Sequence, residues 1–210
     1  IVAFAKSLVG HVRGGLGMSN VVACTLFGGV SGSPVADVSA MGSVMIPMMK
    51  REGYHADYAV NVTTHAALVG ALMPTSHNII IYTLAAGGKV SIAALIAAGV
   101  VPALILTLCN LAAAYFVARS RGYPAGTFPG WHIVARSLVA ALPGLFVVVL
   151  IIVGILSGVF TATESAAVAV LYALALTIFV YRSLTWDQFV RAASKAVKTT
   201  GVVLLLIGIS

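Results

Sequence analysis

The stretch GGVSGSPVAD at residues 28–37 decides how this chain folds. It is polar, contains three glycines and carries a carboxylate at Asp37. It separates two apolar segments, 18–29 and 34–49, each shorter than the roughly 20 residues that a membrane-spanning helix needs. Non-helical backbone is tolerated at membrane depth only where protein or a water-filled cavity covers it. The stretch therefore predicts a re-entrant helical hairpin whose tip lies at Ser31–Ser33.

The composition predicts an all-α integral membrane protein. Of the 210 residues, 60% are hydrophobic and 8% are charged, whereas an ordinary soluble domain has roughly 25% charged residues. With so few charges, the net charge of +7 indicates basic cytoplasmic loops and not a nucleic-acid surface.

The positions of the basic residues predict that the hairpin enters the membrane and returns to the same side. Lys6 and Arg13 precede the two apolar segments, and Lys50 and Arg51 follow them. One long span would place positive clusters on both faces of the membrane, which the positive-inside rule disfavours.

A second polar interruption lies at Pro74-Thr75-Ser76-His77-Asn78, between the apolar runs 56–73 and 79–86. Because a proline removes a helical hydrogen bond and clashes with the preceding turn, this pattern predicts a membrane helix broken near the middle of the bilayer. Gly87–Lys89 is expected to form a turn outside the membrane.

The rest of the chain predicts further spans and surface helices, grouped into three regions. Residues 1–90 are expected to hold the hairpin and broken helix, residues 91–198 the scaffold and connecting helices, and residues 199–210 the start of a truncated span. The individual predictions are spans at 92–118, 138–157 and 165–181, an interfacial segment at 131–141, a polar interruption at 158–164 and an amphipathic surface helix at 185–198.

Hydroxyl groups at the two interruptions predict a cation site. The tip offers Ser31 and Ser33, and the break offers Thr75 and Ser76, together with carbonyls released from helical hydrogen bonds. Oxygen ligands of this kind bind sodium, and transporters build such sites from discontinuous helices near the membrane midplane. The alternative, that these side chains only cap helix ends, stays open.

The candidate substrate-binding residues are Ser33, Asp37 and Asn78. An intramembrane carboxylate is costly, so Asp37 either neutralises a bound cation or interacts with a helix N-terminus and a nearby hydroxyl. Asn78 can donate and accept hydrogen bonds and could contact a substrate, as could Ser33. His65 and His77 either make packing hydrogen bonds or carry protons.

Three segments together resemble a known family. They are GVSGSPVADVSAMGSVMIPMMKREGY (29–54), MPTSHNIIIYTLAAGGKVSIAALIAAGVVPALIL (73–106) and GVFTATESAAVAVLYAL (158–174). They are similar to the large membrane subunit, DctM type, of tripartite ATP-independent periplasmic (TRAP) transporters. The resemblance covers essentially the whole chain and implies the central part of a longer, repeated subunit.

The resemblance implies an elevator-type secondary transporter in the bacterial inner membrane, not an enzyme, that couples organic-acid uptake to sodium. It implies a small four-helix membrane subunit (DctQ type) and a periplasmic binding protein (DctP type) as partners, Na⁺ as coupling ion, and no other cofactor. By this similarity, Ser31, Gly32 and Ser33 form the hairpin tip, and Pro74, Thr75 and Ser76 form the unwound helix. His77 and Asn78 depart from the family's usual apolar residues, so a proton contribution through His77 stays open.

Three alternatives compete with this interpretation. Gly29-Val30-Ser31-Gly32 also resembles the serine motif of rhomboid intramembrane proteases, with His65 or His77 as the base. Re-entrant loops also line channels. Other sodium- or proton-coupled anion transporters with hairpins are the nearest alternative.

Overall fold

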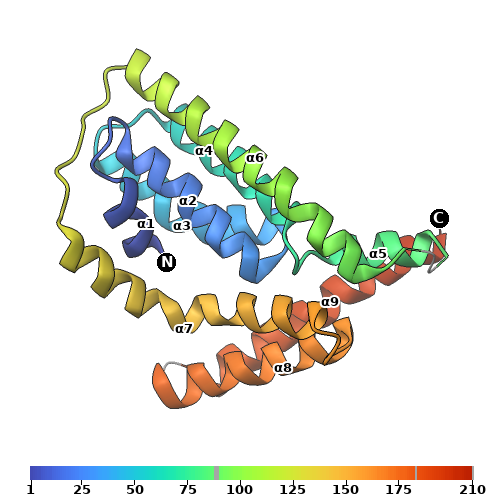
Figure 1. Ribbon diagram of the computed structural model, residues 1–210. Coiled ribbons are helices and arrows are strands. Elements are labelled where there is room, and N and C mark those ends of the chain that lie inside the picture. Colours follow the sequence, from blue (N-terminus) through green and yellow to red (C-terminus); the bar gives the residue numbers. More distant parts are fainter. Residues whose placement is uncertain (88–89, 183, 210) are drawn as a thin grey trace. The chain divides into compact units, whose positions relative to one another are not determined.

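A computed structural model of the chain describes residues 1–87, 90–182 and 184–209, and all its named elements in these ranges are helices. Figure 1 shows them in chain order. Their bounds are α1 (Val2–Val9), α2 (Gly15–Ser31), α3 (Pro34–Arg51), α4 (Ala56–Ala67), the 3₁₀-helix η1 (Leu68–Leu72), α5 (His77–Ala85), α6 (Ile92–Ser120), α7 (Trp131–Leu156), α8 (Ala162–Ala175), the π-helix η2 (Leu176–Val180) and α9 (Trp186–Ile209).

The chain divides into two compact units, residues Ile1–Ala169 and Val170–Ser210. In the first unit, α2 contacts α3, α4, α6 and α7, and α1 packs on both α2 and α7 (Figure 1). The α2 helix is therefore the central element of this unit. The predicted division at residues 90 and 198 follows expected roles in transport, and it stays a prediction.

Helices α2 and α3 run in opposite directions, as the sequence predicts. Leu16 at the start of α2 shares a buried cluster with Met45 and Met49 near the end of α3. Only Gly32 and Ser33 separate the two helices. The chain thus goes out along α2 and returns along α3, while the depth of this hairpin in a membrane stays a prediction.

The open end of the α2–α3 pair is tied together by aromatic and charged side chains. Tyr54 stacks on Tyr58 with ring centroids 5.9 Å apart, and Tyr123 packs against both rings. Two ion pairs surround this cluster. They join Lys6 to Glu52 at 3.0 Å and Arg121 to Asp57 at 2.7 Å.

The predicted broken helix is present, and its break starts earlier than expected. The α4 helix tightens into η1 at Leu68, and residues 73–76 leave helical geometry altogether. His77 and Asn78, expected in the break, instead begin α5. The reason is that the Ser76 hydroxyl accepts a hydrogen bond from the Asn78 backbone amide at 3.3 Å, which starts a new helix. Gly88 and Lys89 of the predicted turn lie outside the described residues.

Three described helices are long and apolar enough to cross a membrane: Ile92–Ser120, Trp131–Leu156 and Thr163–Val180. Each matches a predicted span. Residues 131–141 belong to the same helix, α7, as the span, and their position in the membrane interface stays a prediction. No proline or glycine interrupts the segment before Pro143, and α7 accommodates that proline within its length.

The second unit contains the end of α8, η2 and α9. The predicted surface helix at 185–198 and the predicted span from 199 form one continuous helix, α9. Nothing between Lys198 and Thr200 breaks a helix, so the change from amphipathic to apolar composition occurs without a change of backbone.

Candidate functional site

The tip between α2 and α3 is a tight turn shaped by three consecutive residues. Gly32 ends α2 in the left-handed conformation (φ +59°), and its amide donates to the Gly28 carbonyl at 2.8 Å. Ser33 caps α3 by accepting from the Ala36 amide at 3.5 Å, and Pro34 occupies the first turn, where no amide donor is needed. The predicted cap role of Ser33 is confirmed.

The tip lies directly against the break between η1 and α5. The Thr75 hydroxyl donates toward the carbonyls of Gly28 and Gly29, at 3.3 Å and 3.1 Å. A β-carbon placed on Gly32 would collide with the Thr75 carbonyl and lie 2.7 Å from the Ser76 amide nitrogen. The structure therefore brings Ser31–Ser33 and Pro74–Ser76 together, although they are more than 40 residues apart in the sequence.

Asp37 lies fully buried behind the tip. One of its carboxylate oxygens, Oδ1, accepts a hydrogen bond from the Ser31 hydroxyl. The other oxygen, Oδ2, is buried and has no hydrogen-bond partner among the described residues. A buried carboxylate oxygen without a donor is costly, and a bound cation is one way to satisfy it.

Two glycines leave room around the free Asp37 oxygen. A β-carbon on Gly70 would lie 2.5 Å from Oδ2, and one on Gly28 would lie 3.0 Å from it. Gly70 belongs to η1 and Gly28 to α2, so backbone from both interrupted elements borders this oxygen. Sequence reasoning assigned no role to Gly70; its position just before the Pro74 break was the available signal.

The other predicted site residues differ in exposure. Ser76 is buried, Ser31, Ser33 and Thr75 are half-buried, and Asn78 is exposed. A cavity of about 200 Å³ adjoins the break, lined by Pro74, Thr75 and Ser76 and by apolar side chains, most of them isoleucines. The hydroxyls at the break therefore reach a small, mostly apolar hollow.

A second buried polar group, missed by sequence reasoning, fixes the hairpin to α4. The Asn20 amide nitrogen donates to the Thr63 hydroxyl at 2.6 Å, and the thiol of Cys24 donates to the Asn20 carbonyl oxygen at 3.4 Å. Asn20 and Thr63 are both fully buried. The signal was an asparagine inside an apolar segment, one turn before Cys24.

The serine-protease alternative finds no support in the positions of the described side chains. The Ser31 hydroxyl donates to Asp37, and the Nδ1 atom of His65 is 2.8 Å from the Asn61 carbonyl of its own helix. The side chain of His77, the other proposed base, lies outside the described residues.

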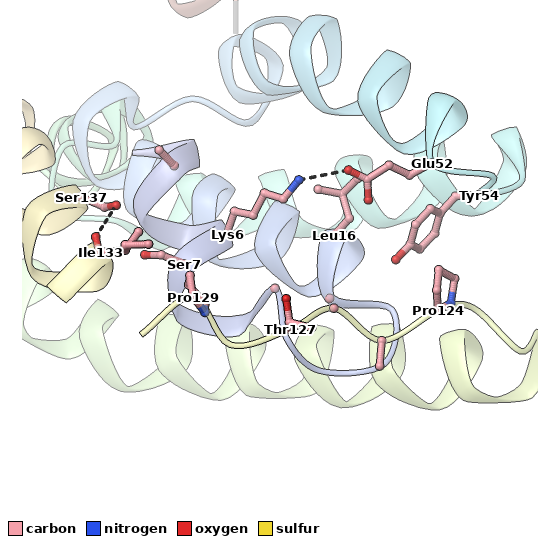
Figure 2. Close-up of a pocket in the computed structure, with 15 residues that line it drawn as sticks. Lys6, Ser7, Leu16, Glu52, Tyr54, Pro124, Thr127, Pro129, Ile133 and Ser137 are labelled. Atoms are coloured by element: carbon pink, nitrogen blue, oxygen red, sulfur yellow. Dashed lines mark hydrogen bonds and ion pairs between the residues drawn. The ribbon is translucent and has the colours of Figure 1, made fainter. Parts of the chain in front are cut away.

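A larger cavity lies elsewhere, at the open end of the hairpin. It measures about 560 Å³, and Lys6, Leu16, Glu52 and Tyr54 are among its lining residues (Figure 2). None of the predicted site residues lines it. The dashed line between Lys6 and Glu52 in Figure 2 marks their ion pair, and the other joins the Ser137 hydroxyl to the Ile133 carbonyl.

Comparison with known proteins identifies the family. The family model of the tripartite ATP-independent periplasmic transporter, DctM component, matches residues 1–210. The chain belongs to the DctM family. This match confirms the resemblance stated from the three sequence segments. DctM proteins are transporter permeases and not a class of enzymes.

Curated DctM relatives carry names with different substrates. The chain is 40% identical over 207 residues to the sialic acid TRAP transporter large permease protein SiaM of Vibrio cholerae, covering 99% of this chain and 48% of that protein. It is 39% identical over 184 residues to the C4-dicarboxylate TRAP transporter large permease protein DctM of the same species (88% and 40%). It is 37% identical over 208 residues to the ectoine/5-hydroxyectoine TRAP transporter large permease protein UehC of Ruegeria pomeroyi (99% and 48%). The chain spans about half the length of these relatives.

Proposed function

We propose that this chain is part of a permease that couples the uptake of an organic acid to the entry of sodium. The observation that carries the proposal is the contact between the hairpin tip and the helix break, with the free oxygen of Asp37 behind it. Membership of the DctM family supports the transport role. The different substrates named for the relatives leave the substrate of this chain at the level of an organic acid.

The oxygen atoms at the contact suit a sodium ion. Ser31, Thr75 and Ser76 provide hydroxyls, and Asp37 provides a negative charge. Sodium is a hard cation that binds oxygen ligands, and unwound helix segments supply such ligands in transporters. The burial of Asp37 supports a role in neutralising the ion more than a direct contact with substrate.

The substrate would bind on the exposed side of the same contact. Ser33 and Asn78 remain candidates there, because both are less buried than Asp37. Ser33 caps the N-terminus of α3, and the positive end of a helix favours an anionic group. A carboxylate at this position would lie near the proposed sodium ion and be stabilised by it.

The proposal extends to motion and partners. The hairpin and α4 share the buried Asn20–Thr63 hydrogen bond, which suits elements that move together as a transport domain. A small membrane subunit of the DctQ type and a periplasmic binding protein of the DctP type would complete the transporter in the bacterial inner membrane.

Uptake in proteoliposomes tests the proposal. The full-length permease is reconstituted with its small subunit, and its loaded binding protein is added outside. We expect uptake to require an inward sodium gradient and to be lost without the binding protein. Uptake that is indifferent to the sodium gradient would contradict the coupling.

Two substitutions test the site itself. Ser33→Ala and Thr75→Ala should weaken the sodium dependence of uptake more than they lower expression. Ser43→Ala and Thr64→Ala serve as matched controls, because these exposed hydroxyls bond only to carbonyls of their own helices. Unchanged sodium dependence in both site variants would contradict the assignment of Ser33 and Thr75 to the sodium site.

A further inference from the structure

The second unit has an excess of positive charge that the proposed transport mechanism does not use. Between residues 170 and 210 the sequence contains four basic residues and a single acidic residue, Asp187. Arg191 pairs with Asp187 at 2.5 Å along α9. Lys195 and Lys198 form no ion pair within the described residues and are exposed.

The first half of α9 separates charge from apolar surface. Trp186, Val190 and Val197 follow helical spacing along one face, and their exposed fractions are 78%, 47% and 72%. Arg191, Lys195 and Lys198 follow the same spacing along the opposite face. A basic face opposite an exposed aromatic and aliphatic face is typical of a helix that lies in the membrane interface.

The start of α9 holds its aromatic residues in a fixed arrangement. The Thr185 hydroxyl accepts from the Gln188 amide at 3.4 Å, and the Gln188 side chain accepts from the Thr185 amide at 3.0 Å. These reciprocal bonds form a capping box. Trp186 then stacks on Phe189 with ring centroids 5.6 Å apart.

An apolar cavity of about 450 Å³ lies beside this start, within the second unit. Its lining residues are Leu174, Ile178, Leu184, Thr185, Trp186 and Phe189. Arg182 is exposed and lies two residues after the end of η2. An open apolar hollow suits an acyl chain, and the exposed cationic side chains of the same unit suit a phosphate.

We propose that Arg182 and residues 184–198 bind anionic phospholipids, with Arg182, Lys195 and Lys198 contacting the headgroups and the apolar cavity receiving an acyl chain. The occupant follows from charge complementarity, because zwitterionic lipids offer this basic surface no net attraction. Each basic side chain near an anionic membrane surface contributes up to about fivefold in binding. The inference concerns lipid binding alone and does not depend on sodium coupling.

Tryptophan fluorescence can test this lipid selectivity directly. The chain contains two tryptophans, so Trp131→Phe leaves Trp186 as the only reporter in this sequence. The full chain with this substitution is reconstituted in vesicles that contain brominated phosphatidylglycerol or brominated phosphatidylcholine. We expect stronger quenching by the brominated phosphatidylglycerol, and a selectivity that falls as salt is added.

Charge variants locate the effect. Lys195→Gln with Lys198→Gln should bring the binding ratio of the two lipids close to one, whereas Lys195→Arg with Lys198→Arg should retain the preference. Lys6→Gln serves as a control, because Lys6 belongs to the other unit and pairs with Glu52. Equal quenching by both lipids in the Trp131→Phe protein would overturn the proposal. Absence of quenching by either lipid would also overturn it, since the aromatic face would then be covered by protein.

Discussion

Gly32 and Thr75 meet backbone to backbone. Gly32 has the left-handed conformation at the tip of the hairpin, and a β-carbon on it would strike the carbonyl of Thr75 in the break of the neighbouring helix. The hydroxyl of Thr75 in turn donates to the last turn of α2. The two interruptions therefore form one structural unit.

Gly32→Ala should reduce uptake by at least about tenfold, because the added methyl group pushes the tip away from the break. Gly53→Ala is a matched control: Gly53 also has a positive φ (+84°), but a β-carbon there meets nothing within 4 Å. Both variants carry the left-handed strain of roughly 1–2 kcal/mol. Uptake assays with equal amounts of folded protein measure the difference, and similar losses in both variants would argue against the close contact as the cause.

Thr63→Val should lower the free energy of unfolding by about 1–3 kcal/mol, because it removes the acceptor of the buried Asn20 amide. Thr64→Val, one position along α4, replaces an exposed hydroxyl and should change the free energy of unfolding by less than about 0.5 kcal/mol. Denaturant unfolding in detergent micelles compares the two. Equal effects would mean that the Asn20–Thr63 bond does not hold the hairpin on α4.

The ion pair between Asp57 and Arg121 should give a stability contribution that is lost in acid. Hydrogen bonds from Arg121 lower the pKa of Asp57 from 3.8 to about 2. Because the pKa is lower in the folded state, the contribution is complete above about pH 5 and is lost progressively as the pH falls towards about 1. Thermal unfolding of the wild type and Asp57→Asn should differ at neutral pH and converge in this range. A full difference that persists at about pH 1 would exclude the carboxylate as its source.

Local sequence signals were sufficient for the hairpin. Predicted apolar segments 18–29 and 34–49 correspond to α2 and α3, which are two to three residues longer at three of their four ends. The boundary at Pro34 is correct because Ser33 and Pro34 form a helix start that depends only on neighbouring residues. The break near Pro74 was predicted for the same reason.

Contacts between distant segments were not predictable. Nothing in the sequence indicates that Thr75 donates to Gly28 and Gly29, or that Asn20 pairs with Thr63, because both depend on how helices pack. The need for glycine at position 70 becomes clear only from its contact with Asp37, where a β-carbon would lie 2.5 Å from Oδ2. The continuous helices α7 and α9 were divided in the prediction because composition changes along them while the backbone does not.

The sodium dependence of uptake in Asp37→Asn reports on the negative charge beside the proposed ion. Asparagine keeps an acceptor for the Ser31 hydroxyl but removes the negative charge beside the proposed ion. Asp57→Asn is the matched control, since it removes an exposed carboxylate from the same unit. Uptake is measured over a series of sodium concentrations at fixed substrate. We expect Asp37→Asn to raise the sodium concentration for half-maximal uptake by about tenfold or more, equivalent to ~1.4 kcal/mol, and Asp57→Asn to leave this concentration unchanged. The same half-maximal sodium concentration in the wild type and Asp37→Asn would contradict this expectation.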